Sequence, residues 1–133
     1  MRYPIVVHKD SDSDYGVTVP DIPGCFSAGD TLDTAIENAI EAIECHVEGL
    51  LIDGEDIPQP GFAEVHHQNP DFEGGTWAIA SVDLSKLSGK AKRINITVPE
   101  RLLTKIDAKA TELGENRSNF LVTAAMEYMS KSV

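Results

Sequence analysis

Residues 92–99 read Lys-Arg-Ile-Asn-Ile-Thr-Val-Pro. Apolar and polar residues alternate through this run, which predicts a β-strand with one apolar face and one polar face. The apolar residues are Ile94, Ile96 and Val98, and the polar residues are Arg93, Asn95 and Thr97. Pro99 then ends the strand and suits the first position of a helix, where its missing N–H group costs no hydrogen bond.

Two helices are predicted after this strand. Apolar residues recur at spacings of three and four from Leu102 to Leu113, and Gly114 is a natural stop for the first helix. The second helix is predicted to begin with Ser118 as its N-cap and to place apolar residues from Phe120 to Tyr128 on one face.

A strand and two helices over residues 92–133 bury too little apolar surface to be stable alone. The single strand also has no partner for its backbone N–H and C=O groups. Two copies solve both problems if their strands pair as an antiparallel ribbon, with the apolar face buried against four helices. We therefore expect at least a dimer through residues 92–133, and association of N-terminal regions into a tetramer stays open. The outer, polar face of such a ribbon fits the major groove of DNA.

The C-terminal segment resembles the ribbon-helix-helix family of DNA-binding repressors. The resemblance is carried by the run from Arg93 to Pro99, by Leu113-Gly114 and by Asn116-Arg117-Ser118-Asn119-Phe120-Leu121. It implies that the outward strand residues read bases and that the N-terminus of the second helix binds a phosphate, which the helix dipole favours. The expected DNA-binding residues are Lys92, Arg93, Asn95, Thr97, Arg117, Ser118 and Asn119.

Charge is divided unevenly along the chain. The net charge is −11, which by itself argues against nucleic acid as a partner. Residues 1–88, however, hold 17 acidic and three basic residues, a net charge of −14, whereas residues 89–133 hold five acidic and eight basic residues, a net charge of +3. An acidic part and a basic part indicate two functions, with partners of opposite charge.

The first 84 residues predict a βββαβ domain and the whole chain an α+β fold. The strands are expected over residues 3–8, 15–19, 25–28 and 76–84, and an amphipathic helix over 31–51 with Thr31 as its N-cap. Trp77 and Ile79 are expected to pack on this helix. Residues 53–75, rich in Pro and Gly, read as an irregular insertion, and residues 85–91 as a linker to the C-terminal domain at 92–133.

The N-terminal part resembles the HicB antitoxin family over about residues 1–51. The matching stretches are Tyr3-Pro4-Ile5-Val6-Val7, Val19-Pro20-Asp21-Ile22-Pro23-Gly24-Cys25 and Gly29-Asp30-Thr31-Leu32, followed by the acidic helix. The resemblance implies a partial RNase H-like fold that binds and neutralises a small basic mRNA-cleaving toxin of the HicA type. It also implies a C-terminal part that represses the shared operon.

The acidic face of the predicted helix is the candidate toxin-binding surface. Like charges four residues apart destabilise an isolated helix by roughly 0.2–0.5 kcal/mol per pair, which makes a basic partner favourable. A plain solvated face is the open alternative. The residues expected to bind the toxin are Glu37, Glu41, Glu44 and Glu48.

Two other classes of function stay open at this point. An RNase H-like nuclease would use clustered carboxylates and two Mg²⁺ ions, but the first strand, residues 3–8, contains no acid. A stand-alone ribbon-helix-helix repressor with a small-molecule sensor domain would need a pocket that no motif announces. We therefore expect an antitoxin that is not an enzyme and has no catalytic residues.

No cofactor, metal or membrane is expected. His8, His46, His66 and His67 lack the spacing that brings ligands to one metal ion together with Cys25 or Cys45. The chain has no apolar run long enough for a bilayer and no signal-peptide pattern at residues 1–8, so we expect it in the cytoplasm.

Overall fold

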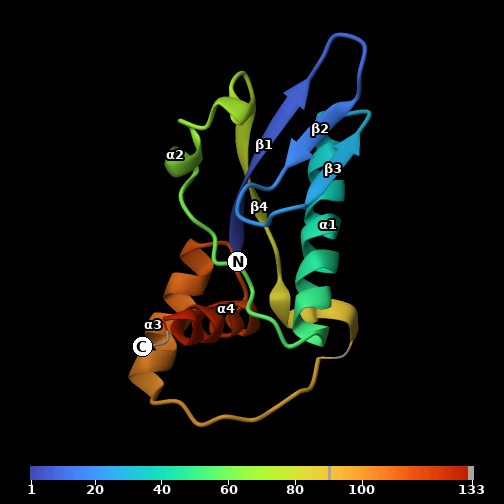
Figure 1. The fold of residues 1–133 in the computed structure, drawn as a ribbon. Coiled ribbons are helices and arrows are strands. Elements are labelled where there is room, and N and C mark those ends of the chain that lie inside the picture. Colours follow the sequence, from blue (N-terminus) through green and yellow to red (C-terminus); the bar gives the residue numbers. More distant parts are fainter. Residues whose placement is uncertain (90, 132–133) are drawn as a thin grey trace. The chain divides into compact units, whose positions relative to one another are not determined.

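The computed structural model describes residues 1–89 and 91–131, which divide into two compact units (Figure 1). The first unit is Arg2–Val82, and the second contains Met1 together with the chain from Asp83 onward. Lys90, in the predicted linker, and Ser132 and Val133, at the end of the predicted C-terminal domain, lie outside the described residues.

The first unit contains a four-stranded antiparallel sheet. Its strands are β1 (Arg2–Lys9), β2 (Tyr15–Thr18), β3 (Phe26–Gly29) and β4 (Thr76–Ser81), in the order β3-β2-β1-β4. β1 lies inside the sheet and is fully buried from Tyr3 to Val7, as its run of β-branched residues favours. The sheet and its helices confirm the predicted α+β class, although β4 ends at Ser81, earlier than residue 84.

Helix α1 (Leu32–Ile52) packs against the sheet. The Thr31 hydroxyl accepts a hydrogen bond of 3.1 Å from Thr34 N, which confirms the predicted N-cap. Ala35, Ala39, Ile43 and Val47, four residues apart, form the buried stripe of α1. The helix begins close to β3: a Cβ atom on Gly29 would lie 2.5 Å from Ala35 N, so only glycine allows this approach.

Trp77 lies on the face of the sheet opposite α1, so our prediction that it packs on the helix is wrong. Paired residues on neighbouring strands lie on the same face of the sheet, as do residues two apart along one strand. Gly29, on the α1 face, pairs with Tyr15. Val17, two residues on from Tyr15, pairs with Val7, and Val7 pairs with Thr76. Thr76 is therefore on the α1 face. Alternation along β4 then places Ala78 and Ala80 toward α1, and Trp77 and Ile79 away from it. Ile79 is accordingly exposed, whereas Ala80 is buried.

The segment 53–75 is more ordered than the irregular insertion we expected. It contains α2 (Ala63–His66) and the 3₁₀ turn η1 (Pro70–Phe72). The rings of His66, His67 and Phe72 cover Trp77, with centroids 4.8–6.3 Å from that of the indole. His66 Nε2 also lies 2.9 Å from Asp21 Oδ1. These contacts attach the segment to the sheet of its own unit.

The second unit contains the 3₁₀ helix η2 (Leu84–Gly89) and helices α3 (Glu100–Glu112) and α4 (Arg117–Ser130). Gly114 ends α3 with a φ of +70°, as predicted, and Glu115 N donates to Ala110 O at 2.8 Å beyond it. The linker predicted over 85–91 is wrong in part, because residues 84–89 are helical and η2 packs against α4.

Residues 91–99 have no assigned strand in the single chain. This differs from the strand predicted at 92–98. A β-strand is defined by hydrogen bonds to a neighbouring strand, and the neighbour that we expected for this one belongs to a second copy. The βαα arrangement of a dimeric ribbon-helix-helix domain therefore stays a prediction.

Candidate functional site

The segment 92–98 exposes both of its predicted faces. Lys92, Arg93, Asn95 and Thr97, the expected DNA-contacting residues of this segment, are all exposed. The apolar side chains between them are exposed too, with 70% of Ile94 and 61% of Ile96 accessible to solvent. Alternating apolar side chains this exposed form a surface that requires a partner.

The N-cap of α4 is Asn116, which corrects our prediction of Ser118. Asn116 has an extended backbone, and its side-chain oxygen accepts a hydrogen bond of 2.7 Å from Asn119 N. Ser118 lies inside the first turn and is exposed. Asn and Ser are about equally good N-caps, so the sequence offered two starting points for α4, two residues apart.

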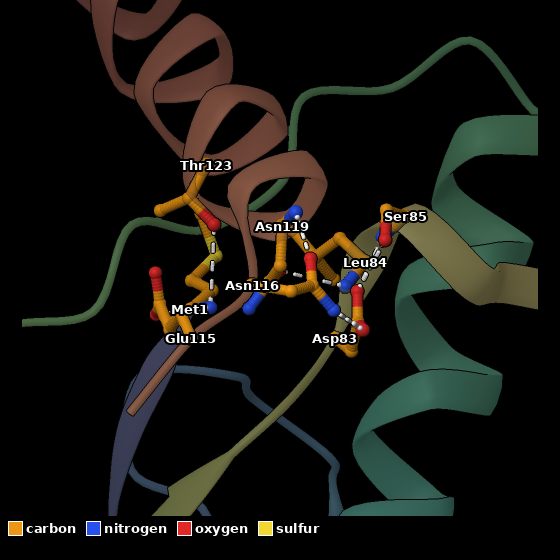
Figure 2. Close-up of polar contacts among 8 residues, drawn as sticks. All are labelled: Met1, Asp83, Leu84, Ser85, Glu115, Asn116, Asn119 and Thr123. Atoms are coloured by element: carbon orange, nitrogen blue, oxygen red, sulfur yellow. Dashed lines mark hydrogen bonds and ion pairs between the residues drawn. The ribbon is translucent and has the colours of Figure 1, made fainter. Parts of the chain in front are cut away.

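Asn119 is buried rather than presented to a ligand. Only 5% of it is exposed, and its Oδ1 accepts a hydrogen bond of 3.1 Å from Leu84 N (Figure 2). Both its backbone N–H and its side-chain oxygen therefore have partners within the unit. The expected phosphate contact of Asn119 stays a prediction, and the exposed Ser118 and Arg117 are better placed to meet a ligand.

Sequence reasoning missed Asp83, which lies beside the N-cap of α4. Its Oδ2 accepts a hydrogen bond of 3.0 Å from Asn116 Nδ2, and its Oδ1 accepts from the backbone N of Ser85 at 3.0 Å (Figure 2). In the sequence Asp83 is one acid among many, and no spacing connects it to Asn116, 33 residues away.

Arg117, another expected DNA contact, is paired with Asp107 of α3. Its Nε and Nη2 atoms donate to the two oxygens of the Asp107 carboxylate, each at 2.8 Å. The hydrogen bonds from Arg117 hold the pKa of Asp107 below its ordinary value, and Asp107 raises the pKa of Arg117 in turn. Both side chains are solvent-exposed, so a phosphate can compete for the guanidinium.

The four glutamates expected to bind a toxin share one helix, α1. Glu37 and Glu41 are exposed, and Glu44 and Glu48 are half-buried. Together with the exposed Asp33 they form an acidic strip along the helix, outside its buried stripe. The strip is solvated in the single chain, so the geometry suits a basic partner but does not distinguish it from a plain solvated face.

Within residues 1–89 and 91–131, no helix has the length and apolar character needed to cross a bilayer.

Comparison with known proteins assigns the family. Residues 3–125 match the family model of the HicB-like antitoxins of bacterial toxin–antitoxin systems. A 14.9 kDa protein of Haemophilus phage HP1, from the rep-hol intergenic region, is 49% identical over 123 residues, which cover 91% of this chain and 92% of that protein. The crystal structure of the Burkholderia pseudomallei antitoxin HicB is 50% identical, with a TM-score of 0.77, and the match covers 96% of this chain and 98% of that one.

A chain in the structure of the HicA3 and HicB3 toxin–antitoxin complex is 34% identical, with a TM-score of 0.54, and the match covers 62% of this chain and 99% of that one. The family match spans nearly all of the present chain, including the segment 92–98 and most of α4. The chain belongs to the HicB-like antitoxins of bacterial toxin–antitoxin systems, a non-enzymatic family.

Proposed function

We propose that this chain neutralises a small basic toxin of the HicA type through its first unit and represses its own operon by binding DNA through a dimer of residues 92–133. The observation that carries the toxin half is the likeness to a chain in a complex of HicA3 with HicB3. The charge of −14 on residues 1–88 supports it, because complementary charge speeds the encounter of two proteins.

The DNA half rests on the segment 92–98. Arg93, Asn95 and Thr97 alternate with apolar residues that are exposed in the single chain. Pairing of two such segments buries the apolar side and leaves a ribbon whose polar side fits the major groove. Arg offers two donors to guanine, and the Asn carboxamide matches adenine. The ribbon then reads the sequence, while the first turn of α4 contacts the backbone.

One experiment separates the two halves. The full chain is measured against the product of the neighbouring toxin gene by surface plasmon resonance, and against a duplex from the region upstream of its own gene by gel shift. Asn95→Ala should weaken binding to the upstream duplex by roughly 2–6 kcal/mol per dimer, because each lost base contact is worth about 1–3 kcal/mol. It should leave a scrambled duplex and the toxin nearly unaffected.

The toxin half has its own variants. Glu37→Lys with Glu41→Lys should lower the association rate with the toxin about ten-fold at low salt, and added salt should reduce the difference. Asp10→Lys with Asp12→Lys makes the same change in net charge on exposed residues of the β1–β2 turn and is the matched control. Equal effects of the two pairs would show that α1 is not the contact surface. Unchanged operator binding by Asn95→Ala would show that the ribbon does not read the bases.

A further inference from the structure

The N-cap residue of α4, Asn116, is hydrogen-bonded to a carboxylate of the same chain, that of Asp83. Asp83 Oδ2 accepts from Asn116 Nδ2 at 3.0 Å, and Asp83 Oδ1 accepts from both the backbone N of Ser85 at 3.0 Å and the Ser85 hydroxyl at 2.5 Å. Figure 2 shows Asp83 beside Asn116, with Ser85 bonded from its other side. Asn116 and Ser85 thus both bind this carboxylate.

Leu84, the residue after Asp83, is also hydrogen-bonded to the first turn of α4. Asn119 Oδ1 accepts from Leu84 N at 3.1 Å, and Asn119 N in turn donates to Asn116 Oδ1 at 2.7 Å. Leu84 and Asn119 are both buried. Asn116 and Asn119 thus form a clasp, linked to each other and to the dipeptide Asp83-Leu84. The clasp residues, Asn116 and Asn119, lie on either side of Arg117 and Ser118.

The side chain of Arg117, in the same turn, is also bound by a carboxylate. The guanidinium of Arg117 is bound by both oxygens of the Asp107 carboxylate. A helix N-terminus carries a partial positive charge and favours an anion. In the free chain, therefore, carboxylates engage both the N-cap and the basic side chain of the turn that the proposed function assigns to a DNA phosphate.

We propose that the hydrogen bond from Asn116 to Asp83 within this clasp is an autoinhibitory contact, which keeps a negative charge at the phosphate-contacting turn of α4 until DNA displaces it. The inference rests on the proposed DNA-binding function. A phosphate that reaches Ser118 and Arg117 is repelled by Asp83 as long as the clasp holds. Binding of DNA thus includes the release of Asp83 from Asn116, and its free-energy cost lowers affinity for every DNA sequence equally, because it concerns the phosphate backbone and not the bases.

Two substitutions alter the contact in different ways: one removes the donor at position 116 and the other removes the charge at position 83. Asn116→Ser keeps an N-cap of equal quality, but its shorter side chain carries no N–H donor for Asp83. Asp83→Asn keeps the shape of the side chain and removes its charge. Glu127→Gln is the matched control, because it removes one exposed negative charge from the same unit near the C-terminal end of α4.

The full-length chain and these variants are titrated, at one salt concentration, with the duplex from upstream of its own gene and with a scrambled duplex of equal length. A net side-chain hydrogen bond is worth about 1 kcal/mol, so Asn116→Ser should bind both duplexes roughly 3- to 10-fold more tightly than the wild type. Asp83→Asn should do the same, and Glu127→Gln should change affinity less than two-fold.

A purely structural role of the clasp predicts the opposite sign, because loosening α4 can only weaken binding. Unchanged or weaker binding by Asn116→Ser, with thermal unfolding showing a folded protein, would overturn the autoinhibitory contact while leaving DNA binding in place. A gain from Asp83→Asn that Glu127→Gln matches would also overturn it, because the loss of one negative charge anywhere in the unit would then explain the gain. If the wild type and all variants bind neither duplex, the proposed DNA-binding function fails, and the inference fails with it.

Discussion

Replacement of Ile96 by Asp should convert the protein from dimer to monomer. Ile96 lies in the middle of the segment 92–98 and is 61% exposed in the single chain, and Ile94 is 70% exposed. In the proposed ribbon these side chains face the helices of both copies. An aspartate at position 96 brings two carboxylates into that apolar layer, one from each chain.

The exposed fractions set the size of the effect. Full burial of an isoleucine side chain contributes roughly 1.5–3 kcal/mol. About two thirds of each of the two side chains remains to be buried, so each contributes about 1–2 kcal/mol on dimerisation and the four in a dimer about 4–8 kcal/mol. Ile96→Asp removes half of this and adds the cost of burying charge, which amounts to several kcal/mol more. The dimer dissociation constant should rise by at least about a thousand-fold.

The assay is sedimentation equilibrium of the full chain at micromolar concentration, with hydrogen exchange of the amides of residues 92–98. The wild type should sediment as a dimer or larger and protect alternate amides of this segment, whereas Ile96→Asp should be a monomer without that protection. Thr97→Asp places the same charge one residue away on the polar face and should remain dimeric. A wild-type monomer, or an Ile96→Asp variant that dimerises as tightly as the wild type, would refute the ribbon.

Two further outcomes follow from the second unit. Asn119→Leu leaves the buried N–H of Leu84 without its acceptor and should lower the free energy of unfolding of this unit by about 1–3 kcal/mol in urea titrations; an unchanged free energy of unfolding would contradict this role. The pKa of Asp107 is lowered in the folded state by Arg117, so this pair stabilises the fold above the ordinary carboxyl pKa of about 4 and loses its contribution as the pH falls through the lower folded value. The free energy of unfolding of Asp107→Asn should therefore be closer to that of the wild type at pH 2 than at pH 6. A difference that stays the same at both pH values would contradict the pairing.

The elements of the first unit were predictable because each of their patterns is local. Thr31 and the apolar residues at intervals of four define α1 without reference to the rest of the chain. Gly114 is similar in the second unit, because the positive φ that ends α3 suits glycine. In both cases the residues that determine the structure are within one or two turns of it.

The wrong predictions concern residues for which the local sequence allows two arrangements and contacts with a distant segment select one of them. Trp77 and Ile79 were expected to pack on α1, but the register of the sheet places Ala78 and Ala80 on the side toward α1. The indole is covered instead by His66, His67 and Phe72, from a segment whose composition indicates only a loop. The choice of Asn116 over Ser118 as N-cap likewise accompanies a bond to Asp83, which no local pattern shows.

Dimerisation and DNA binding are coupled through the two faces of one segment. Three cations of the second unit, Lys109, Arg117 and Lys131, each lie in an ion pair with an acid of the same unit and must exchange it for a phosphate. Affinity that comes from phosphate contacts grows with the number of phosphates neutralised, so one copy binds weakly, and only two copies present enough contacts on one duplex. Ile94 and Ile96 must also be buried before Arg93, Asn95 and Thr97 can lie in register on a groove, because a lone strand has no fixed geometry. Operator occupancy should therefore rise with protein concentration along the same curve as the dimer, and the apolar face of residues 92–98 controls repression as strictly as the polar face that reads the bases.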